Sequence, residues 1–355
     1  MLRRHLAGIP LAAVLGLGLL PSVAQAAPGA ATSGLAQSAV TTSVAKPAAS
    51  VVRVATFNVR TARATGDKRN WLKRAPDVAR TILSRSPGVV ALQELGPGRA
   101  DGRTGTLKGH VRQTISLTNS LQKLGGGRYK LVRTTAYVAP GTAHGTQGAR
   151  ILYDSTRFQL VSHCAETTGK RNYNMACAFD LPIASGDSRK LRRSAAYAEL
   201  ADRRTGRHFF VVSAHLDPRH SGSSKTEAKY NRLRSAQATT VANAMLRVNP
   251  KGRPVVFGGD INSWQTDRGN YAPHRVLVSR GYVDATSAGE RINYAYATIN
   301  HFSTTLSKSR SGAGVRLDVL MLKNGRGFTR YENVMAARDS SRPSDHNMGL
   351  ADILL

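Results

Sequence analysis

Apolar runs rich in β-branched residues alternate along the chain with segments in which apolar residues recur every three or four positions. The runs predict strands at 51–58, 88–93, 129–137, 148–154, 157–162, 194–201, 207–214, 253–259, 315–322, 332–337 and 348–354. The helical spacing predicts helices over 70–86, 113–124, 225–247 and 273–280. No break in composition divides this region, so we predict one α/β domain over residues 51–355.

Short polar clusters stand at the edges of these apolar runs. They are Thr56-Phe57-Asn58, Leu92-Gln93-Glu94, Ser213-Ala214-His215, Gly258-Gly259-Asp260-Ile261-Asn262 and Ser344-Asp345-His346. Strands that are buried on both faces keep their polar residues at their ends. The last cluster precedes its run, so its strand must run antiparallel to the others if all five are to meet. We then expect carboxylates, an amide and two imidazoles at one sheet edge, as in metal-assisted hydrolytic sites.

Asp260 and Asn262 form the most informative pair. Two glycines precede them and allow a turn and the close approach of a ligand. Their i, i+2 spacing points both side chains to one side. The carboxylate suits the activation of water and the amide suits the orientation of a phosphate oxygen. The alternative is an Asx-turn that ends the strand.

The acids and amides of the other clusters are individually less specific. Glu94 is a good ligand for a hard metal ion, and the amide oxygen of Asn58 can complete a magnesium shell. The alternatives are a helix-capping or salt-bridged glutamate and an asparagine in a turn. His215 follows a strand, where a lone histidine is more often structural.

Asp345-His346 opens the final strand, and an acid inside another strand is a candidate partner for the imidazole. Asp318 lies within an apolar run, and a buried carboxylate without a partner is costly. It could orient His346, which would then act as a general acid or a phosphate ligand. The alternative is a salt bridge between Asp318 and Arg316.

The charge of the chain indicates an anionic partner. There are 51 Lys and Arg residues against 21 Asp and Glu, a formal net charge of +30. Nucleic acid is the leading candidate partner. Anionic lipid head groups and teichoic-acid-like polymers are alternatives, and so are a surface adapted for solubility and a codon bias toward arginine.

The first residues are typical of an export signal. Arg3 and Arg4 precede an apolar run at 9–20, which is too short to span a membrane, and Ala24-Gln25-Ala26 follows. We predict a signal peptide at 1–26 that is cleaved after Ala26, although the arginine pair leaves twin-arginine export open. Residues 27–50 read as a disordered linker or pro-segment. The mature protein is expected to be secreted and extracellular, without stable membrane insertion, and monomeric.

The chain has two cysteines, Cys164 and Cys177. In an exported protein they are expected to form a disulfide bond, which would close a short loop. The alternative is a pair of free thiols. A thiolate metal site is not indicated, because no further cysteine pair or matched histidine spacing accompanies them.

The polar clusters together resemble the endonuclease/exonuclease/phosphatase superfamily, the DNase I-like metal-dependent phosphohydrolases. The resemblance is carried, in family order, by Thr56-Phe57-Asn58, Leu92-Gln93-Glu94, Ile151-Leu152-Tyr153-Asp154, Ser213-Ala214-His215-Leu216, Gly259-Asp260-Ile261-Asn262, Arg316-Leu317-Asp318 and Ser344-Asp345-His346. It implies a mixed α/β (α+β) fold, a four-layered α/β sandwich of two packed mixed β-sheets flanked by helices. It also implies hydrolysis of phosphoester bonds with Mg²⁺, or with Mn²⁺ or Ca²⁺.

The resemblance assigns expected roles to individual residues. Those that would hold the metal are Glu94, Asn58 and Asp345. Those that would activate water or contact the phosphate are Asp260, Asn262, His215, His346 (positioned by Asp318) and Arg150. A mid-chain phosphate-contacting residue is not evident, and Tyr137 and His144 are only candidates for it. Segment 284–314 matches no family motif and is either a substrate-contacting loop or a plain surface loop.

These observations predict a secreted phosphodiesterase, foremost a nuclease acting on DNA or RNA. One alternative is a sphingomyelinase-like or other non-nucleic phosphoesterase. Another is a non-catalytic polyanion-binding module with the same fold.

Overall fold

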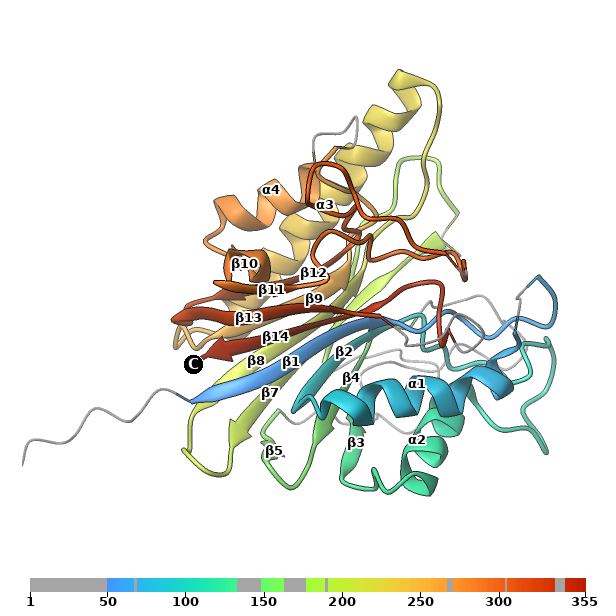
Figure 1. Ribbon diagram of the computed structural model, residues 1–355. Coiled ribbons are helices and arrows are strands. Elements are labelled where there is room, and N and C mark those ends of the chain that lie inside the picture. The colour runs from blue at the N-terminus through green and yellow to red at the C-terminus, as the bar shows by residue number, and fades with distance from the viewer. Residues whose placement is uncertain are drawn as a thin grey trace, which may run out of the picture. The chain divides into compact units, whose positions relative to one another are not determined.

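Two β-sheets pack face to face in the computed structural model, and helices cover the outer face of each sheet (Figure 1). The structure describes residues 50–66, 69–132, 148–162, 177–188, 191–266, 271–303, 305–335 and 342–355. The predicted signal peptide, nearly all of the predicted linker, and Tyr137, His144 and Cys164 lie outside these residues. The two packed mixed sheets and their flanking helices confirm the predicted fold class.

The first sheet has the order β11-β13-β14-β1-β2-β4-β3. In chain order its strands are β1 (Val51–Asn58), β2 (Val89–Gln93), β3 (Tyr129–Val132), β4 (Arg150–Asp154), β11 (Glu290–Ile292), β13 (Gly327–Val334) and β14 (Met348–Leu354). The second sheet has the order β10-β12-β9-β8-β7-β5, with β6 also paired to β7. Its strands are β5 (Phe158–Leu160), β6 (Ala178–Asp180), β7 (Ser194–Asp202), β8 (His208–His215), β9 (Val255–Asp260), β10 (Val283–Asp284) and β12 (Asp318–Lys323).

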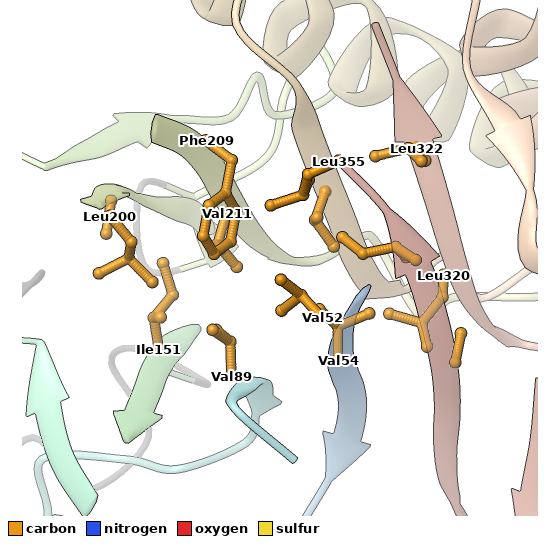
Figure 2. Close-up of a cluster of buried hydrophobic side chains, with 14 of the residues drawn as sticks. Val52, Val54, Val89, Ile151, Leu200, Phe209, Val211, Leu320, Leu322 and Leu355 are labelled. Carbon is orange, nitrogen blue, oxygen red and sulfur yellow. The ribbon is translucent and has the colours of Figure 1, made fainter. Parts of the chain in front are cut away.

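Alternation along the strands divides the apolar residues among three layers. Val52 and Val54 of β1 face Val211, Leu320 and other residues of the second sheet (Figure 2). Ala55 and Phe57, on the other face of β1, point outward against helices α1 (Trp71–Arg85) and α2 (Gln113–Lys123). The outer face of the second sheet packs on α3 (Ser224–Val248) and α4 (Ala272–Ser279). Strands buried on both faces explain the continuous apolar runs.

The helices follow the predicted apolar spacing. In α1 the buried residues include Trp71, Ala75, Val78 and Ile82, and the Asn70 side chain caps the helix by accepting a hydrogen bond from the Lys73 N–H at 3.1 Å. None of the helices in the described ranges combines the length and the hydrophobicity that a membrane crossing requires.

The differences from the predicted elements lie mainly at sheet edges. β6, β10 and β11 are short edge pairings without a detectable apolar pattern, and the 3₁₀ helix η2 (Ala285–Ser287) joins β10 to the segment before β11. β13 begins at Gly327 rather than near 332, because its first half is a polar ribbon that pairs with β14. The first residues of the segment 284–314, which the sequence predicted to be a loop, therefore carry short elements.

A layer of small and polar residues joins the two sheets near the ends of the central strands. The Ser213 hydroxyl of β8 donates to the Leu92 carbonyl of β2 at 2.7 Å and accepts from the Gln93 side-chain amide at 3.1 Å. Gly258 of β9 faces the same layer, where a Cβ atom would lie 2.6 Å from the Cβ of Ala91 and 3.3 Å from that of Thr56. The absence of a side chain at position 258 therefore sets how closely the sheets approach.

Replacing Gly258 with valine should destabilise the fold by about 1–3 kcal/mol or more, because the side chain would be forced between the sheets. Urea unfolding monitored by circular dichroism measures the effect. Gly127→Val is the matched control, since nothing lies within 4 Å of its Cβ position, and it should change stability by no more than about 0.5 kcal/mol. Equal stabilities of the two variants would contradict this account.

Candidate active site

Strand direction gathers the polar clusters at one edge of the sandwich. β1 and β2 are parallel, as are β8 and β9, so Asn58, Glu94, His215 and Asp260 stand at or just beyond carboxyl ends that meet. β14 runs antiparallel to β1, and His346, two residues before β14 begins, lies at this same edge, as the sequence predicted.

Register fixes the neighbours of Asp260 more closely. Asp260 is paired with His215 across the parallel β8–β9 ladder and with Asp318 across the antiparallel β9–β12 ladder. His346 is added from the first sheet. We call Asn58, Glu94, His215, Asp260, Asp318 and His346 the Asp260 cluster.

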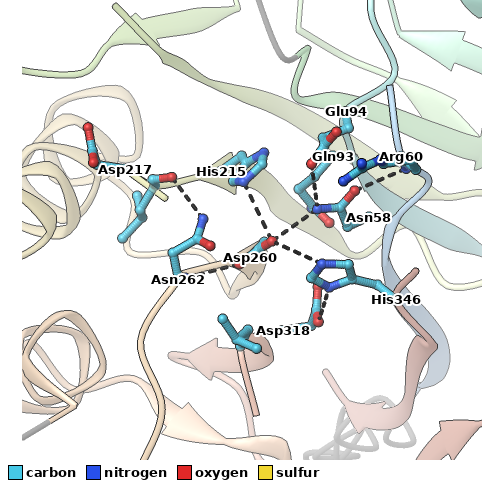
Figure 3. Close-up of polar contacts among 12 residues, drawn as sticks. Asn58, Arg60, Gln93, Glu94, His215, Asp217, Asp260, Asn262, Asp318 and His346 are labelled. Atoms are coloured by element: carbon cyan, nitrogen blue, oxygen red, sulfur yellow. Dashed lines mark hydrogen bonds and ion pairs between the residues drawn. The ribbon is translucent and has the colours of Figure 1, made fainter. Parts of the chain in front are cut away.

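One carboxylate oxygen of Asp260 is the centre of this cluster (Figure 3). Asp260 Oδ2 accepts a hydrogen bond from Asn58 Nδ2 at 3.0 Å. The same oxygen lies 3.5 Å from His215 Nε2 and 3.8 Å from His346 Nε2. All four side chains are buried, and burial together with the charge of Asp318 raises the pKa of Asp260.

The other oxygen of Asp260 holds the local turn. Asp260 Oδ1 accepts the backbone N–H of Asn262 at 3.0 Å, and Asn262 has a positive φ of 47°. This is the Asx-turn that the sequence left as an alternative, and it leaves Oδ2 facing the cluster. The Asn262 side chain donates to the Leu216 carbonyl at 3.0 Å, which ties the loop after β9 to the loop after β8.

The two imidazoles have opposite protonation preferences. Burial lowers the pKa of His346, but the Asp318 carboxylate, 2.8 Å from Nδ1, dominates and raises that pKa to about 10. Burial and then the charge of Arg193 lower the pKa of His215 to about 4. The two imidazoles near this carboxylate oxygen therefore have pKa values shifted in opposite directions.

Asn58 links Glu94 of the first sheet to Asp260 by hydrogen bonds. Its Nδ2 also donates to Glu94 Oε1 at 3.2 Å, while Glu94 Oε2 accepts the Thr61 backbone N–H at 2.9 Å. Burial acts to raise the pKa of Glu94, but His215 and these two hydrogen bonds bring it down to about 2. Glu94 is therefore an ionised carboxylate at the cluster.

Two of the predicted site residues have their described contacts elsewhere. Asp345 Oδ2 forms an ion pair with Arg60 Nη1 at 2.8 Å. Arg150 is buried, and its Nη1 donates to the Ala149 carbonyl at 3.0 Å. Their roles toward a metal ion and a phosphate remain predictions. The alternative pairing of Asp318 with Arg316 is wrong, because Arg316 pairs with Asp284 at 2.9 Å.

Arg193 is a site residue that the sequence analysis missed. It precedes β7, which runs antiparallel to β8, and its guanidinium interacts electrostatically with Asp217, Glu94 and Asp260. Burial lowers its pKa, and among the described residues Nη1 has no hydrogen-bond partner. A polar residue at the start of a strand antiparallel to β8 is expected at this edge of the sheet. That signal could have identified Arg193 only if the strand order had been known, because the chain has 51 basic residues.

The unassigned segment 284–314 contacts the residues around His346. The Asn300 N–H donates to the Asp345 carbonyl at 2.6 Å, and the Asn300 side chain donates to Asn347 at 3.0 Å. Ile299 forms a β-bridge with His346. This part of the segment is therefore a support for His346 rather than a plain surface loop.

The donor set fits a hard divalent cation. Carboxylate oxygens of Asp260 and Asp318 lie within 4.8 Å of each other, and Asp318 Oδ1 is buried with no hydrogen-bond partner in the described chain. Glu94 and Asn58 add a carboxylate and an amide on the other side of Asp260. Oxygen atoms of this kind are what Mg²⁺, Mn²⁺ and Ca²⁺ bind.

The sequence profile of the Endonuclease/Exonuclease/phosphatase family matches residues 55–346, a range that contains the whole Asp260 cluster. The chain belongs to this family. Its members are divalent-metal-dependent hydrolases of phosphoester bonds, and the buried acid and histidine group agrees with that chemistry. Among curated proteins, a search found no match.

Solved structures of this family share the fold. A Bacteroides vulgatus family member is 19% identical with a TM-score of 0.60, covering 86% of this chain and 98% of its own. A Bacteroides thetaiotaomicron mannosyl-6-phosphatase is 17% identical with a TM-score of 0.58, covering 86% and 100%. D. rerio TDP2 complexed with a single-strand DNA product is 16% identical with a TM-score of 0.53, covering 86% and 99%.

Asp318→Asn should return the pKa of His346 from about 10 toward its ordinary value, roughly 6.5, because the anionic partner is lost. Imidazole NMR titration in the presence of a chelator measures the shift. In the wild type the raised pKa stabilises the fold fully below about pH 6.5, and this contribution is lost as the pH rises through the folded-state value. Asp180→Asn, at a surface ion pair, is the control. An unchanged His346 titration in Asp318→Asn would refute the pairing.

Proposed function

We propose that this protein is a secreted, divalent-metal-dependent phosphodiesterase that hydrolyses DNA or RNA. The observation that carries the proposal is the Asp260 Oδ2 atom, which accepts a hydrogen bond from Asn58 and is approached by the imidazoles of His215 and His346. The family membership supplies the reaction class, and the charge of +30 indicates a polyanionic substrate.

Metal binding in this proposal rests on the side of the cluster that faces the first sheet. Glu94 and Asn58 would hold the ion. Asp345, which forms an ion pair with Arg60, would be a further ligand. A bound Mg²⁺, Mn²⁺ or Ca²⁺ ion supplies charge neutralisation at a phosphate oxygen. This matters because the negative charge of a phosphodiester repels an incoming nucleophile.

The chain's own residues supply proton transfer and orientation. Asp260 would accept a proton from the attacking water. Asn58 and His215 would hold the carboxylate in line. The cationic His346, fixed by Asp318, would donate from Nε2 to the phosphate or to the leaving oxygen.

Additional donors would bind the phosphate. Asn262 is held at the loop junction by Leu216, close to Asp260. The guanidinium of the half-buried Arg193 interacts electrostatically with Asp260 and Glu94, and it would give a phosphate a charged donor. The role that the sequence assigned to Arg150 remains a proposal as well.

We propose export from the first residues. The basic start, short apolar run and Ala24-Gln25-Ala26 are typical of a cleaved signal peptide. An oxidising compartment would allow a disulfide between Cys164 and Cys177, of which the described Cys177 is buried.

Substrate panels test the reaction. With Mg²⁺ the wild type should nick plasmid DNA or cleave RNA, and a chelator should abolish the activity. Asp260→Ala should lower the rate by at least about 10²-fold with an unchanged circular dichroism spectrum, because the proton acceptor is lost. Asp180→Ala, at an exposed ion pair, is the control and should retain the wild-type rate.

Other outcomes of this panel would contradict the nuclease assignment. Turnover of sphingomyelin alone would identify a lipid phosphodiesterase, and turnover of a sugar phosphate alone would identify a phosphatase. Binding of nucleic acid without turnover of any substrate would leave only a polyanion-binding module.

Expression of the full chain in a bacterial host tests export. The protein recovered from the medium should begin at Ala27, and thiol titration of the unreduced, denatured protein should detect no free cysteine. Protein that stays in the cells with Met1 intact would refute export.

A further inference from the structure

An aromatic pair joins the loop that carries Asn262 to the loop that follows His215 at the end of β8. Trp264 follows Asn262 by two residues, and His220 follows His215 by five. Their rings are in contact, with centroids 5.2 Å apart and planes inclined at 51°. Trp264 is half-buried and His220 is exposed, so the pair reaches the protein surface.

The pair is close to the proposed phosphate site by chain geometry alone. Two residues span at most about 7 Å of extended chain, so the Cα atom of Trp264 lies within that distance of the Cα atom of Asn262. The hydrogen bond from Asn262 to the Leu216 carbonyl joins the same two loops at positions nearer in sequence to Asp260 and His215. The neighbouring nucleotides of a bound strand lie at a comparable separation from the scissile phosphate.

Hydrogen bonds and ion pairs hold His220 and its loop in place. His220 Nδ1 lies 3.2 Å from Glu227 Oε1, and the buried Arg234 donates to the same oxygen at 2.6 Å. Arg219 precedes His220 and pairs with Asp217 and Asp187, each at 2.7 Å. A ring held this firmly loses little entropy when a flat ligand stacks on it.

We propose that Trp264 and His220 form a stacking site for a nucleobase next to the scissile phosphate. Every base presents a π-face, so such a site adds affinity for single-stranded or frayed substrate without selecting a sequence. This proposal rests on the proposed nuclease function, because it names the part of the substrate that the aromatic pair contacts. It predicts a preference for strands whose bases are accessible.

The tryptophan content of the chain provides a direct reporter. The sequence holds two tryptophans. Trp71 is fully buried, and its Nε1 bonds to Ser116. A ligand that changes intrinsic tryptophan fluorescence by direct contact therefore does so at Trp264.

The experiment compares two oligomers of equal length and charge in the presence of a chelator. One is a single-stranded oligothymidylate and the other is its abasic counterpart. We expect the oligothymidylate to quench the fluorescence of the full chain and the abasic oligomer to leave it unchanged. Equal quenching by both would assign Trp264 to the sugar-phosphate backbone, and no quenching by either would also overturn the proposal.

Variants separate stacking from packing. Trp264→Ala should raise the Kd for oligothymidylate by roughly 5- to 100-fold, measured by fluorescence anisotropy of labelled oligomer, with the Kd for the abasic oligomer unchanged. Trp264→Phe keeps an aromatic face and should retain most of the affinity. Leu246→Ala removes an exposed apolar side chain on α3 and is the control for surface truncation. Equal Kd values for wild type and Trp264→Ala would refute the stacking site.

Failure of the two proposals can be told apart. If the wild type cleaves nucleic acid with Mg²⁺ but Trp264→Ala binds oligothymidylate as the wild type does, only the stacking site is wrong. If the wild type cleaves no nucleic acid yet Trp264 fluorescence responds to bases alone, the nuclease function is wrong and the base site stands.

Discussion

The site depends on the burial of charge at the edge where the two sheets meet. Asp260, Asp318 and His346 have almost no contact with solvent, and a buried charge is tolerated only with a partner. The 2.8 Å contact between His346 and Asp318 supplies one partner, and Asp260 Oδ2 gains another from Asn58. Asp260 and Asp318 come from the second sheet and their partners Asn58 and His346 from the first, so the cluster exists only when the sheets are packed.

The layer beneath the cluster makes that packing close enough. Ser213 and Gln93 hydrogen-bond across the interface, and Gly258 leaves room for Ala91. Small residues here bring the carboxyl ends of β1 and β2 against those of β8 and β9. The same tight layer that stabilises the sandwich thereby sets the distance between Asn58 and Asp260, which links fold stability to the proposed chemistry.

The sequence predicted the central strands well and the sheet edges poorly. β1, β8 and β14 are buried on both faces, so their apolar runs reveal them, whereas β10 and β11 have only two or three residues and no apolar pattern. Site residues at strand ends were recognisable for the same reason. Arg193 and Arg60 were not, because in a chain with 51 basic residues nothing local distinguishes a site arginine from a surface one.

The sequence by itself determined the reaction class, since residues 55–346 carry the family's ordered motifs. It also determined which residue types stand at the strand ends. Only the tertiary structure decided how they pair: Asp318 with His346 instead of Arg316, and Asp345 with Arg60. The physical reason is that charge pairing depends on strand register and on contact between sheets, and both join residues that lie from 28 to 285 positions apart in the chain.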